Sequence, residues 1–323
     1  MNETARAIAA LCGATLLFAA APALSQQYPA KPIRFIVPSG PGIATDTVTR
    51  VVAKKLSERL GWTTVVENRA GGNFVVGIQA TLQAPADGYT VLAAVSSFSV
   101  LPNTMQNLPF DLTKDLVPIT RTARVPTVLI TTPSLPVKTL PELVAFVKAR
   151  PGQLSYATTG SGSYVHLAGE RLKLLTGMNM VHIPYKDTTM LTDVIAGNVP
   201  IGVSTLPTIL PQVQGKRLRA LAILGSARSP LLPDVPTIAE TRLGELDADV
   251  WLGLMVRAGT PEAIVDRLNR EVVAVLQQLD VRDQFLKIGA TPLPETPQQF
   301  GTKLSSDIVQ WGEVIKRAKI KFE

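Results

Sequence analysis

The sequence predicts an α/β protein with two lobes. Its 323 residues exceed the roughly 100–200 residues of one typical domain. Short apolar runs alternate with helix-like periodic segments in two separate series, and this alternation predicts parallel sheets covered by helices. Hydrophobic residues make up 46% and charged residues 18% of the chain, which is typical of a well-packed globular protein.

The first 25 residues predict a secretory signal peptide. Arg6 precedes an Ala/Leu-rich run from Ala7 to Ala20 that is too short for a membrane-spanning helix. We expect cleavage after Ser25, with cleavage after Ala23 as the second possibility. Cys12 is the only cysteine and lies in this segment. The predicted mature chain therefore has no disulfide, no cysteine metal ligand and no cysteine nucleophile.

The first series of elements begins with a buried strand that ends at Pro38. Apolar residues at i+4 spacing then predict a helix with Thr45 and Asp46 as cap-type residues and Gly61 as its stop. The predicted elements are a strand at 33–37, a helix carrying Val48 to Leu60, a strand at 63–67, a turn at 68–73, a helix ending at 84 and a strand at 90–95.

The second series predicts a second α/β lobe, after which the chain ends in two helices. Thr260-Pro261-Glu262 begins one of these helices and Thr296-Pro297 the other. The elements of the second series are strands at 127–131, 154–157, 180–183, 201–205 and 218–223, with helices at 140–149, 165–176 and 190–196; a further strand follows at 250–255.

The charge of the chain is basic but diffuse. There are 32 Lys and Arg against 25 Asp and Glu, a net charge of +7, and aromatic residues are only 5%. Scattered charge without stacking aromatics argues against nucleic-acid binding. Attraction of anionic solutes explains the charge better than nucleic-acid binding does, and a merely solvated basic surface explains it better than either.

The sequence lacks the motifs of common catalytic and metal sites. Only His166 and His182 are available, and their separation matches no compact zinc motif, so His182 is interpreted as a packed structural histidine. Ser161 lacks the flanking glycines of a nucleophile elbow, which disfavours an esterase using Ser161 or Ser163. The same loop lacks the lysine of a P-loop and the third glycine of a dinucleotide fingerprint. We expect no catalytic residue, metal or cofactor.

Two loops of small residues that run from a strand into a helix are candidates for anion binding. The Gly160–Ser163 loop aims backbone N–H groups and the positive end of a helix dipole at its surroundings, and the 38–45 loop has the same geometry in the first series. A tight strand-to-helix turn explains either loop alone. Their joint presence in separate lobes favours binding, because ligands of open α/β sheets lie beyond the carboxyl ends of the strands.

From Tyr28 to its C-terminus the chain resembles the extracytoplasmic solute receptors of tripartite tricarboxylate transporters, the Bug-type binding proteins. The residues that carry the resemblance are Tyr28-Pro29-Ala30-Lys31-Pro32-Ile33-Arg34, Val37-Pro38 with Pro41-Gly42 and Asp46, Glu67-Asn68-Arg69 with Gly71, Asp87-Gly88-Tyr89-Thr90, Leu108-Pro109-Phe110-Asp111, Gly160-Ser161-Gly162-Ser163, His166-Leu167-Ala168-Gly169-Glu170, Pro184-Tyr185-Lys186, Leu232-Pro233-Asp234-Val235-Pro236-Thr237, Trp251 with Gly253, and Ala258-Gly259-Thr260-Pro261.

The resemblance implies a monomeric periplasmic receptor of the type II periplasmic binding protein fold, with two Rossmann-like lobes joined by two crossover strands. Lobe 1 would comprise residues 26–127 and 253–323, and lobe 2 residues 128–252. The cleft between the lobes would hold a small carboxylate through loop backbone groups, small side chains and water, for delivery to membrane permease subunits. Presentation of the ligand to a membrane sensor kinase is the alternative.

Departures from the family pattern suggest the kind of ligand. Ile43 and Phe74 stand where the family usually has glycine, and Ser204 stands where an aspartate is common. We therefore expect a carboxylate with an apolar body, aliphatic or aromatic, and no ammonium group; alternatively, Ile43 and Phe74 turn into the core. The candidate ligand-binding residues are Ser39, Gly40, Gly42, Ile43, Phe74, Ser97, Gly160, Ser161, Gly162, Ser163, Tyr185, Asp187 and Ser204.

Overall fold

The computed structural model describes residues 28–185 and 189–320. From Pro32 onward the chain forms one compact unit. The predicted signal peptide and the candidate Asp187 lie outside the described residues. In the described part of the chain, no helix combines the length and the apolarity needed to cross a membrane.

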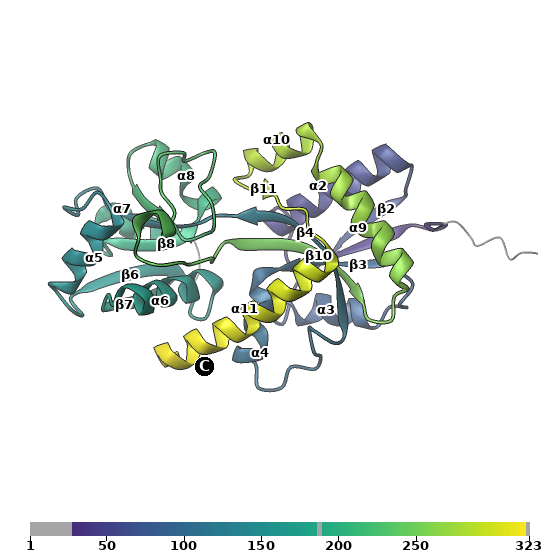
Figure 1. Ribbon diagram of the computed structural model, residues 1–323, viewed down its shortest axis with the longest axis horizontal. Coiled ribbons are helices and arrows are strands. Elements are labelled where there is room, and N and C mark those ends of the chain that lie inside the picture. Colours follow the sequence, from purple (N-terminus) through teal and green to yellow (C-terminus); the bar gives the residue numbers. More distant parts are fainter. Residues whose placement is uncertain (1–27, 186–188, 321–323) are drawn as a thin grey trace, which may run out of the picture. The chain divides into compact units, whose positions relative to one another are not determined.

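The first sheet is mixed and has six strands in the order β11-β4-β10-β3-β1-β2. Parallel pairing joins β1 to β2 and to β3, whereas β10 runs antiparallel to both β3 and β4 (Figure 1). The strands are β1 Ile33–Val37, β2 Thr64–Asn68, β3 Thr90–Val95, β4 Leu116–Val125, β10 Val250–Arg257 and β11 Thr291–Pro292. The sequence patterns did not predict β4, because Thr120, Arg121 and Arg124 interrupt its apolar residues.

The second sheet has five strands in the order β7-β6-β8-β5-β9. Its strand β6 is parallel to β7 and β8, and β5 is antiparallel to β8 and β9. The strands are β5 Thr127–Thr131, β6 Leu154–Thr159, β7 Met180–Tyr185, β8 Ile201–Thr205 and β9 Arg219–Ile223. The two sheets confirm the predicted two-lobe α/β fold.

The helices that follow the strands begin mostly where the sequence predicts them. The longer helices are α2 Ala44–Leu60, α3 Val75–Leu82, α5 Leu140–Lys148, α6 Tyr164–Thr176, α7 Met190–Ala196, α8 Leu206–Gln214, α9 Glu262–Leu276, α10 Leu279–Lys287 and α11 Pro297–Ala318; the short ones are η1 Ser96–Val100, α4 Leu101–Thr104 and η2 Ala239–Thr241.

Three expectations about helices were wrong, and one helix, α8, was missed. Three helices, not two, end the chain, because α10 separates α9 from α11. The N-cap of α2 is Ile43, without a side-chain cap bond, and the N-cap of α9 is Pro261. The predicted cap Thr260 instead donates its hydroxyl to the Arg257 carbonyl. Prolines at 207 and 211 concealed α8, since proline disfavours a helix interior.

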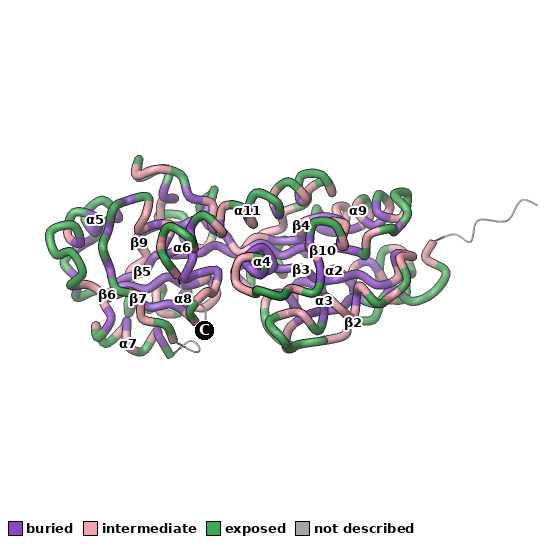
Figure 2. Tube along the Cα trace, turned by 90° about the horizontal axis from the view of Figure 1, so that it is seen from below, coloured by how far each residue is buried: buried purple, intermediate pink, exposed green. Residues whose placement is uncertain are grey.

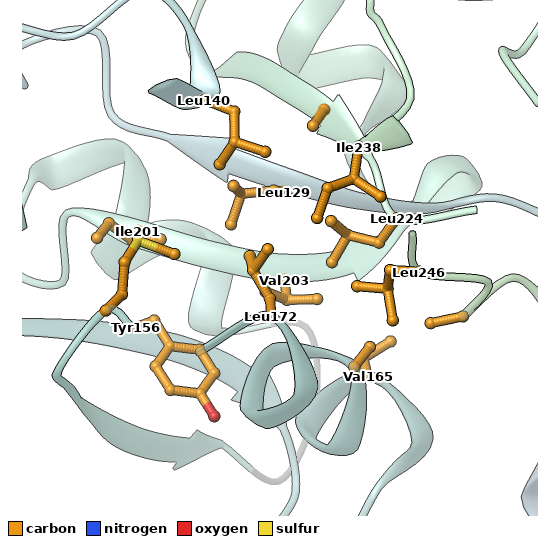
Figure 3. Packing of buried hydrophobic residues seen from close by; sticks show 14 of the residues in the cluster. Leu129, Leu140, Tyr156, Val165, Leu172, Ile201, Val203, Leu224, Ile238 and Leu246 are labelled. Atoms are coloured by element: carbon orange, nitrogen blue, oxygen red, sulfur yellow. The ribbon is translucent and has the colours of Figure 1, made fainter. Parts of the chain in front are cut away.

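The second sheet carries a continuous hydrophobic core. In Figure 3 strand residues such as Leu129 and Val203 pack with helix residues such as Leu140 and Leu172. The same buried cluster also includes Val100 of η1 and Trp311 of α11, which extends it to elements around the first sheet. Figure 2 shows β3, β5 and β10 as buried along most of their length.

The chain passes between the two sheets twice. The first passage is the single residue Pro126 between β4 and β5, and the second is the 224–249 segment between β9 and β10. Arg124 at the end of β4 links these passages, because it donates to the Asp249 carboxylate at 3.3 Å and to the Arg228 carbonyl at 3.2 Å. The exact lobe boundaries at 127/128 and 252/253 stay a prediction.

Helix α11 packs against β4, η1 and α4 and also against α6 (Figure 1). A true capping box at Thr296 and Gln299 begins the helix. Gly253 in β10 leaves room for the Phe300 ring, since a Cβ at that position would lie 2.6 Å from the ring. The helix therefore touches elements associated with both sheets.

Candidate functional site

A cavity of about 280 Å³ is lined by residues that follow strands of both sheets. Its lining combines neutral hydrogen-bonding groups with apolar side chains. The lining residues are Asn73, Phe74, Ser97, Val100, Leu101, Thr104, Ser161, Gly162, Ser163 and Tyr164.

Three strand ends supply these residues. The segment after β2 contributes Asn73 and Phe74 immediately before α3, η1 follows β3, and the Gly160–Ser163 loop joins β6 to α6. Because β2, β3 and β6 belong to the parallel parts of their sheets, the cavity has the position expected for a ligand site in an open α/β fold.

Phe74 adopts an unusual backbone conformation beside the cavity. Its φ of 75° lies in the left-handed region, as does that of Asn73 at 52°. A bulky side chain in this region costs about 1–3 kcal/mol and is retained where the surroundings impose it. The Phe74 ring packs against buried Phe98, with ring centroids 5.6 Å apart. Phe74 is half-buried and is one of the residues that line the cavity.

The Gly160–Ser163 loop uses much of its hydrogen-bonding capacity internally. Ser163 is the N-cap of α6: its Oγ accepts from the His166 N–H at 3.2 Å and donates to the Gly160 carbonyl at 2.9 Å. The Gly162 N–H donates to His166 Nδ1 at 2.9 Å. Ser161 is exposed, which makes its hydroxyl the best placed of the loop to meet a ligand.

Two stacked histidines lie next to this loop. The His166 and His182 rings lie 3.7 Å apart and 10° from parallel, and His182 Nε2 is 2.8 Å from Thr158 Oγ1. Burial lowers the pKa of His166 to about 4, with Glu170 opposing and Lys173 adding to the shift. Burial, the neighbouring His166 and Lys173 lower the pKa of His182 to about 3. Both rings are therefore neutral near pH 7.

The loop after β1 is organised around its own carboxylate. Asp46 in the first turn of α2 accepts the Gly42 N–H at 2.9 Å and pairs with Arg50 at 3.0 Å. Despite burial, which acts in the opposite direction, hydrogen bonds from Arg50, Gly42 and Asn68 leave the pKa of Asp46 lowered. A negative charge thus already occupies the positive end of this helix.

The remaining described candidates lie outside the cavity lining. Ser39 and Gly40 are half-buried, Gly42 and Ile43 are exposed, and Gly160 accepts hydroxyl hydrogen bonds at its carbonyl. Tyr185 donates its hydroxyl to Asp193 at 2.5 Å, and Ser204 is buried in β8 opposite Val128. Their role in binding stays a prediction.

Sequence reasoning missed half of the cavity lining. Asn73, Val100, Leu101, Thr104 and Tyr164 were not among the candidates. The position of the 96–104 segment could have pointed to Val100, Leu101 and Thr104, since this segment directly follows the carboxyl end of β3. Among residues 28–185 and 189–320, no group of three or more His, Cys, Asp or Glu side chains could hold a metal ion.

Comparison with known proteins identifies the family. The family described as tripartite tricarboxylate transporter family receptor matches residues 48–320. Protein BugT of Bordetella pertussis (strain Tohama I) is 39% identical over 307 residues, covering 94% of each chain. A structure described as R. palustris Rpa4515 with adipate is 31% identical, with a TM-score of 0.75 over 92% of this chain and all of the other.

Two further solved structures are similar to this chain. The periplasmic binding protein BugD is 29% identical with a TM-score of 0.71, covering 92% of this chain and all of BugD. MatC (Rpa3494) from Rhodopseudomonas palustris with bound malate is 26% identical with a TM-score of 0.70, covering 89% of this chain and all of MatC. The predicted resemblance and the predicted fold of periplasmic binding proteins are therefore confirmed. The chain belongs to the tripartite tricarboxylate transporter receptor family and is a Bug-type periplasmic solute-binding receptor.

Proposed function

We propose that this receptor captures a small carboxylate with an apolar body in the cavity and delivers it to a tripartite tricarboxylate-type permease without chemical change. One observation carries the proposal: the cavity is lined jointly by loops that follow strands of both sheets. A ligand bound there contacts both lobes and so favours the closed arrangement of the receptor.

Neutral donors suit the carboxylate end of such a ligand. Ser97 and Ser161 offer hydroxyl groups, Asn73 offers an amide, and α6 begins at the cavity with the positive end of its dipole. Related receptors with bound adipate and malate support a carboxylate ligand.

Apolar side chains suit the body of the ligand. Phe74, Val100, Leu101 and Tyr164 contribute to the lining, and the volume of about 280 Å³ restricts the ligand to a small molecule. Each 25 Å² of apolar surface removed from water contributes about 0.6 kcal/mol, so hydrocarbon contact is an appreciable part of the affinity. Aromatic and aliphatic carboxylates are thus the preferred class.

Membership of the family supports the proposed partners and location. We propose that the mature chain acts as a monomer in the periplasm after removal of residues 1–25, and that the permease subunits recognise its ligand-bound form. Residues 26–127 with 253–323, and residues 128–252, would be the two lobes that close on the ligand.

A thermal-shift screen of mono-, di- and tricarboxylates tests the proposal. A ligand at 100 times its Kd should stabilise the folded protein by about 2.7 kcal/mol. The matched control is the primary amide of each hit, which keeps the body but removes the negative charge. Recovery of the hit unchanged after long incubation would support binding without catalysis. Equal stabilisation by amide and acid, or no stabilisation by any carboxylate, would contradict the proposal.

A further inference from the structure

The stacked histidines are linked to the loop that borders the cavity, His166 directly and His182 through Thr158. His166 Nδ1 accepts the Gly162 N–H at 2.9 Å, and Thr158, which is bonded to His182, also reaches the Gly160 carbonyl at 3.4 Å. His166 is only 4% exposed, and His182 is half-buried. The loop conformation is thus coupled to the state of these two rings.

Acceptance at Nδ1 requires that this nitrogen carry no proton. A proton there would set two donors against each other and abolish the bond to Gly162. The charged groups around the pair are Glu170, whose Oε1 lies 3.9 Å from His166 Nε2, and Lys173, which pairs with Glu170 at 2.8 Å. Tyr156 donates its hydroxyl to Glu170 at 2.5 Å. The Glu170 carboxylate is therefore largely committed to Tyr156 and Lys173 and is not free to stabilise an imidazolium.

We infer that His166, supported by the flat contact with His182, is a positioning residue that fixes Gly162 and thereby presents Ser161 to the ligand. The inference rests on the proposed function for its consequence in binding, but the hydrogen bond that it invokes exists without ligand. Neither histidine lines the cavity. Their effect on affinity is therefore indirect, through the loop.

Two substitutions at position 166 separate the hydrogen bond from mere packing. His166→Asn keeps an acceptor oxygen near the position of Nδ1, whereas His166→Leu keeps bulk and removes the acceptor. The Gly162 amide should exchange with solvent about tenfold or more faster in His166→Leu than in the wild type or His166→Asn, because protection depends on the bond that closes the amide. In His182→Phe, which retains a flat ring, protection should persist, and in His182→Ala it should fall.

Calorimetry with adipate and with benzoate as probes measures the consequence for binding. We expect His166→Leu to bind about 3- to 10-fold more weakly than the wild type at pH 7.5, and His166→Asn to stay within about twofold. Val194→Ala, a buried substitution in α7 outside the cavity lining, is the control for general loss of stability.

Imidazole nitrogen shifts give a signature that a purely packed histidine would not show. His166 Nδ1 should appear as an unprotonated hydrogen-bond acceptor at pH 7.5, coupled to the Gly162 amide. Unchanged Gly162 exchange in His166→Leu would overturn the inference, as would equal losses of affinity in His166→Leu and Val194→Ala. If neither probe binds to the wild type and no other carboxylate does, the proposed function fails while the exchange measurement still decides the role of His166.

Discussion

At the scale of single residues, the cavity is bordered both by a residue in a strained backbone conformation and by residues that satisfy the hydrogen-bonding groups of the backbone. Phe74 pays a backbone cost to hold its ring against Phe98, whereas Ser163 and His166 satisfy backbone groups of the loop beside it. Strain of this kind persists when the surrounding structure imposes it, and it clusters at functional sites. We therefore expect substitution of Phe74 to change the ligand preference more than substitution of any other lining residue.

We expect Phe74→Gly to lower the affinity for aromatic carboxylates about 3- to 10-fold, because the loss of ring contact removes about 0.5–1.5 kcal/mol. Aliphatic carboxylates should lose less. Phe74→Leu, which keeps apolar bulk without the aromatic face, is the matched variant. Calorimetric titration with benzoate and adipate measures the preference, and an unaltered ratio in Phe74→Gly would show that the ring does not face the ligand.

The two buried tyrosines of the second lobe predict opposite responses to loss of their hydroxyl groups. The Tyr156 hydroxyl donates to Glu170, whereas the buried Tyr164 hydroxyl has no partner in the described structure. Tyr156→Phe should destabilise by about 1–3 kcal/mol, and Tyr164→Phe should be neutral or stabilising. Urea unfolding of both variants provides the comparison; equal destabilisation would indicate that Tyr164 is also hydrogen-bonded.

At the scale of elements, α6 is both a packing helix and the end of the site. Its first residue, Tyr164, lines the cavity and meets Trp311 of α11 edge-to-face, with centroids 4.9 Å apart. Its N-cap and the two residues before the cap belong to the same lining. A substitution that removes the cap of this helix should therefore mainly change stability, whereas a substitution that removes a ligand contact should mainly change affinity.

Ser163→Ala should cost about 1 kcal/mol of stability, the usual cost of losing an N-cap side chain. Ser161→Ala should leave stability within about 0.5 kcal/mol, since the residue is exposed. The same change should weaken carboxylate binding several-fold, because one hydroxyl hydrogen bond is worth about 0.5–1.5 kcal/mol. Denaturant unfolding and calorimetry give the two quantities. A fall in stability shared equally by both variants would contradict this division of roles.

The sequence predicted elements well where local signals agreed. Strand β1, with its apolar run and terminal proline, and helix α6, with its Gly/Ser entry, lie close to their expected bounds. Strand β4 and helix α8 were missed because polar residues and prolines mask their burial, which depends on tertiary neighbours. In the candidate site, the Ser161–Ser163 stretch and Phe74 were predicted from the sequence, and they lie together in one lining. Leu101 and Thr104 were not, because a segment after a strand carries no motif of its own.

At the scale of the whole molecule, buried ionisable groups set the response to pH. The pKa values of His166 and His182 are lowered from about 6.5, so the unfolded chain binds more protons than the folded chain below pH 6.5. Stability from these groups is fully present above pH 6.5 and is lost as the pH falls toward 4. Asp249 opposes this trend, because burial raises its pKa to about 7 and its contribution is lost as the pH rises through 7.

We therefore expect the free energy of unfolding to fall on acidification from pH 6.5 to 4, by about 3 kcal/mol from His166 alone. His166→Asn should flatten the decline because the amide does not titrate. Asp249→Asn should instead steepen the decline, because it removes a contribution of opposite sign that the wild type loses as the pH rises from about 4 to 7. Denaturant unfolding at a series of pH values measures these slopes, and parallel curves for the wild type and His166→Asn would exclude His166 as their cause.

Closure of the lobes is expected to accompany binding, with motion at Pro126 and in the 224–249 segment. A saturating carboxylate from the screen should reduce the radius of gyration measured by small-angle scattering. Arg124→Ala, which removes the bonds to Asp249 and to the Arg228 carbonyl, should alter the radius of the free protein more than that of the bound one. An identical radius with and without ligand would count against closure.

The central position of β10 also dictates the order in which the molecule can assemble. Strands β3 and β4 are separated by only 20 residues in the chain, yet they become neighbours in one sheet only through β10, which is more than 120 residues further on. The five strands of the second sheet all lie between residues 127 and 223, so they can pair while the first sheet is still incomplete. Contacts of such long sequence separation form slowly. During synthesis from the N-terminus, the half that begins the chain is thus the last to be finished.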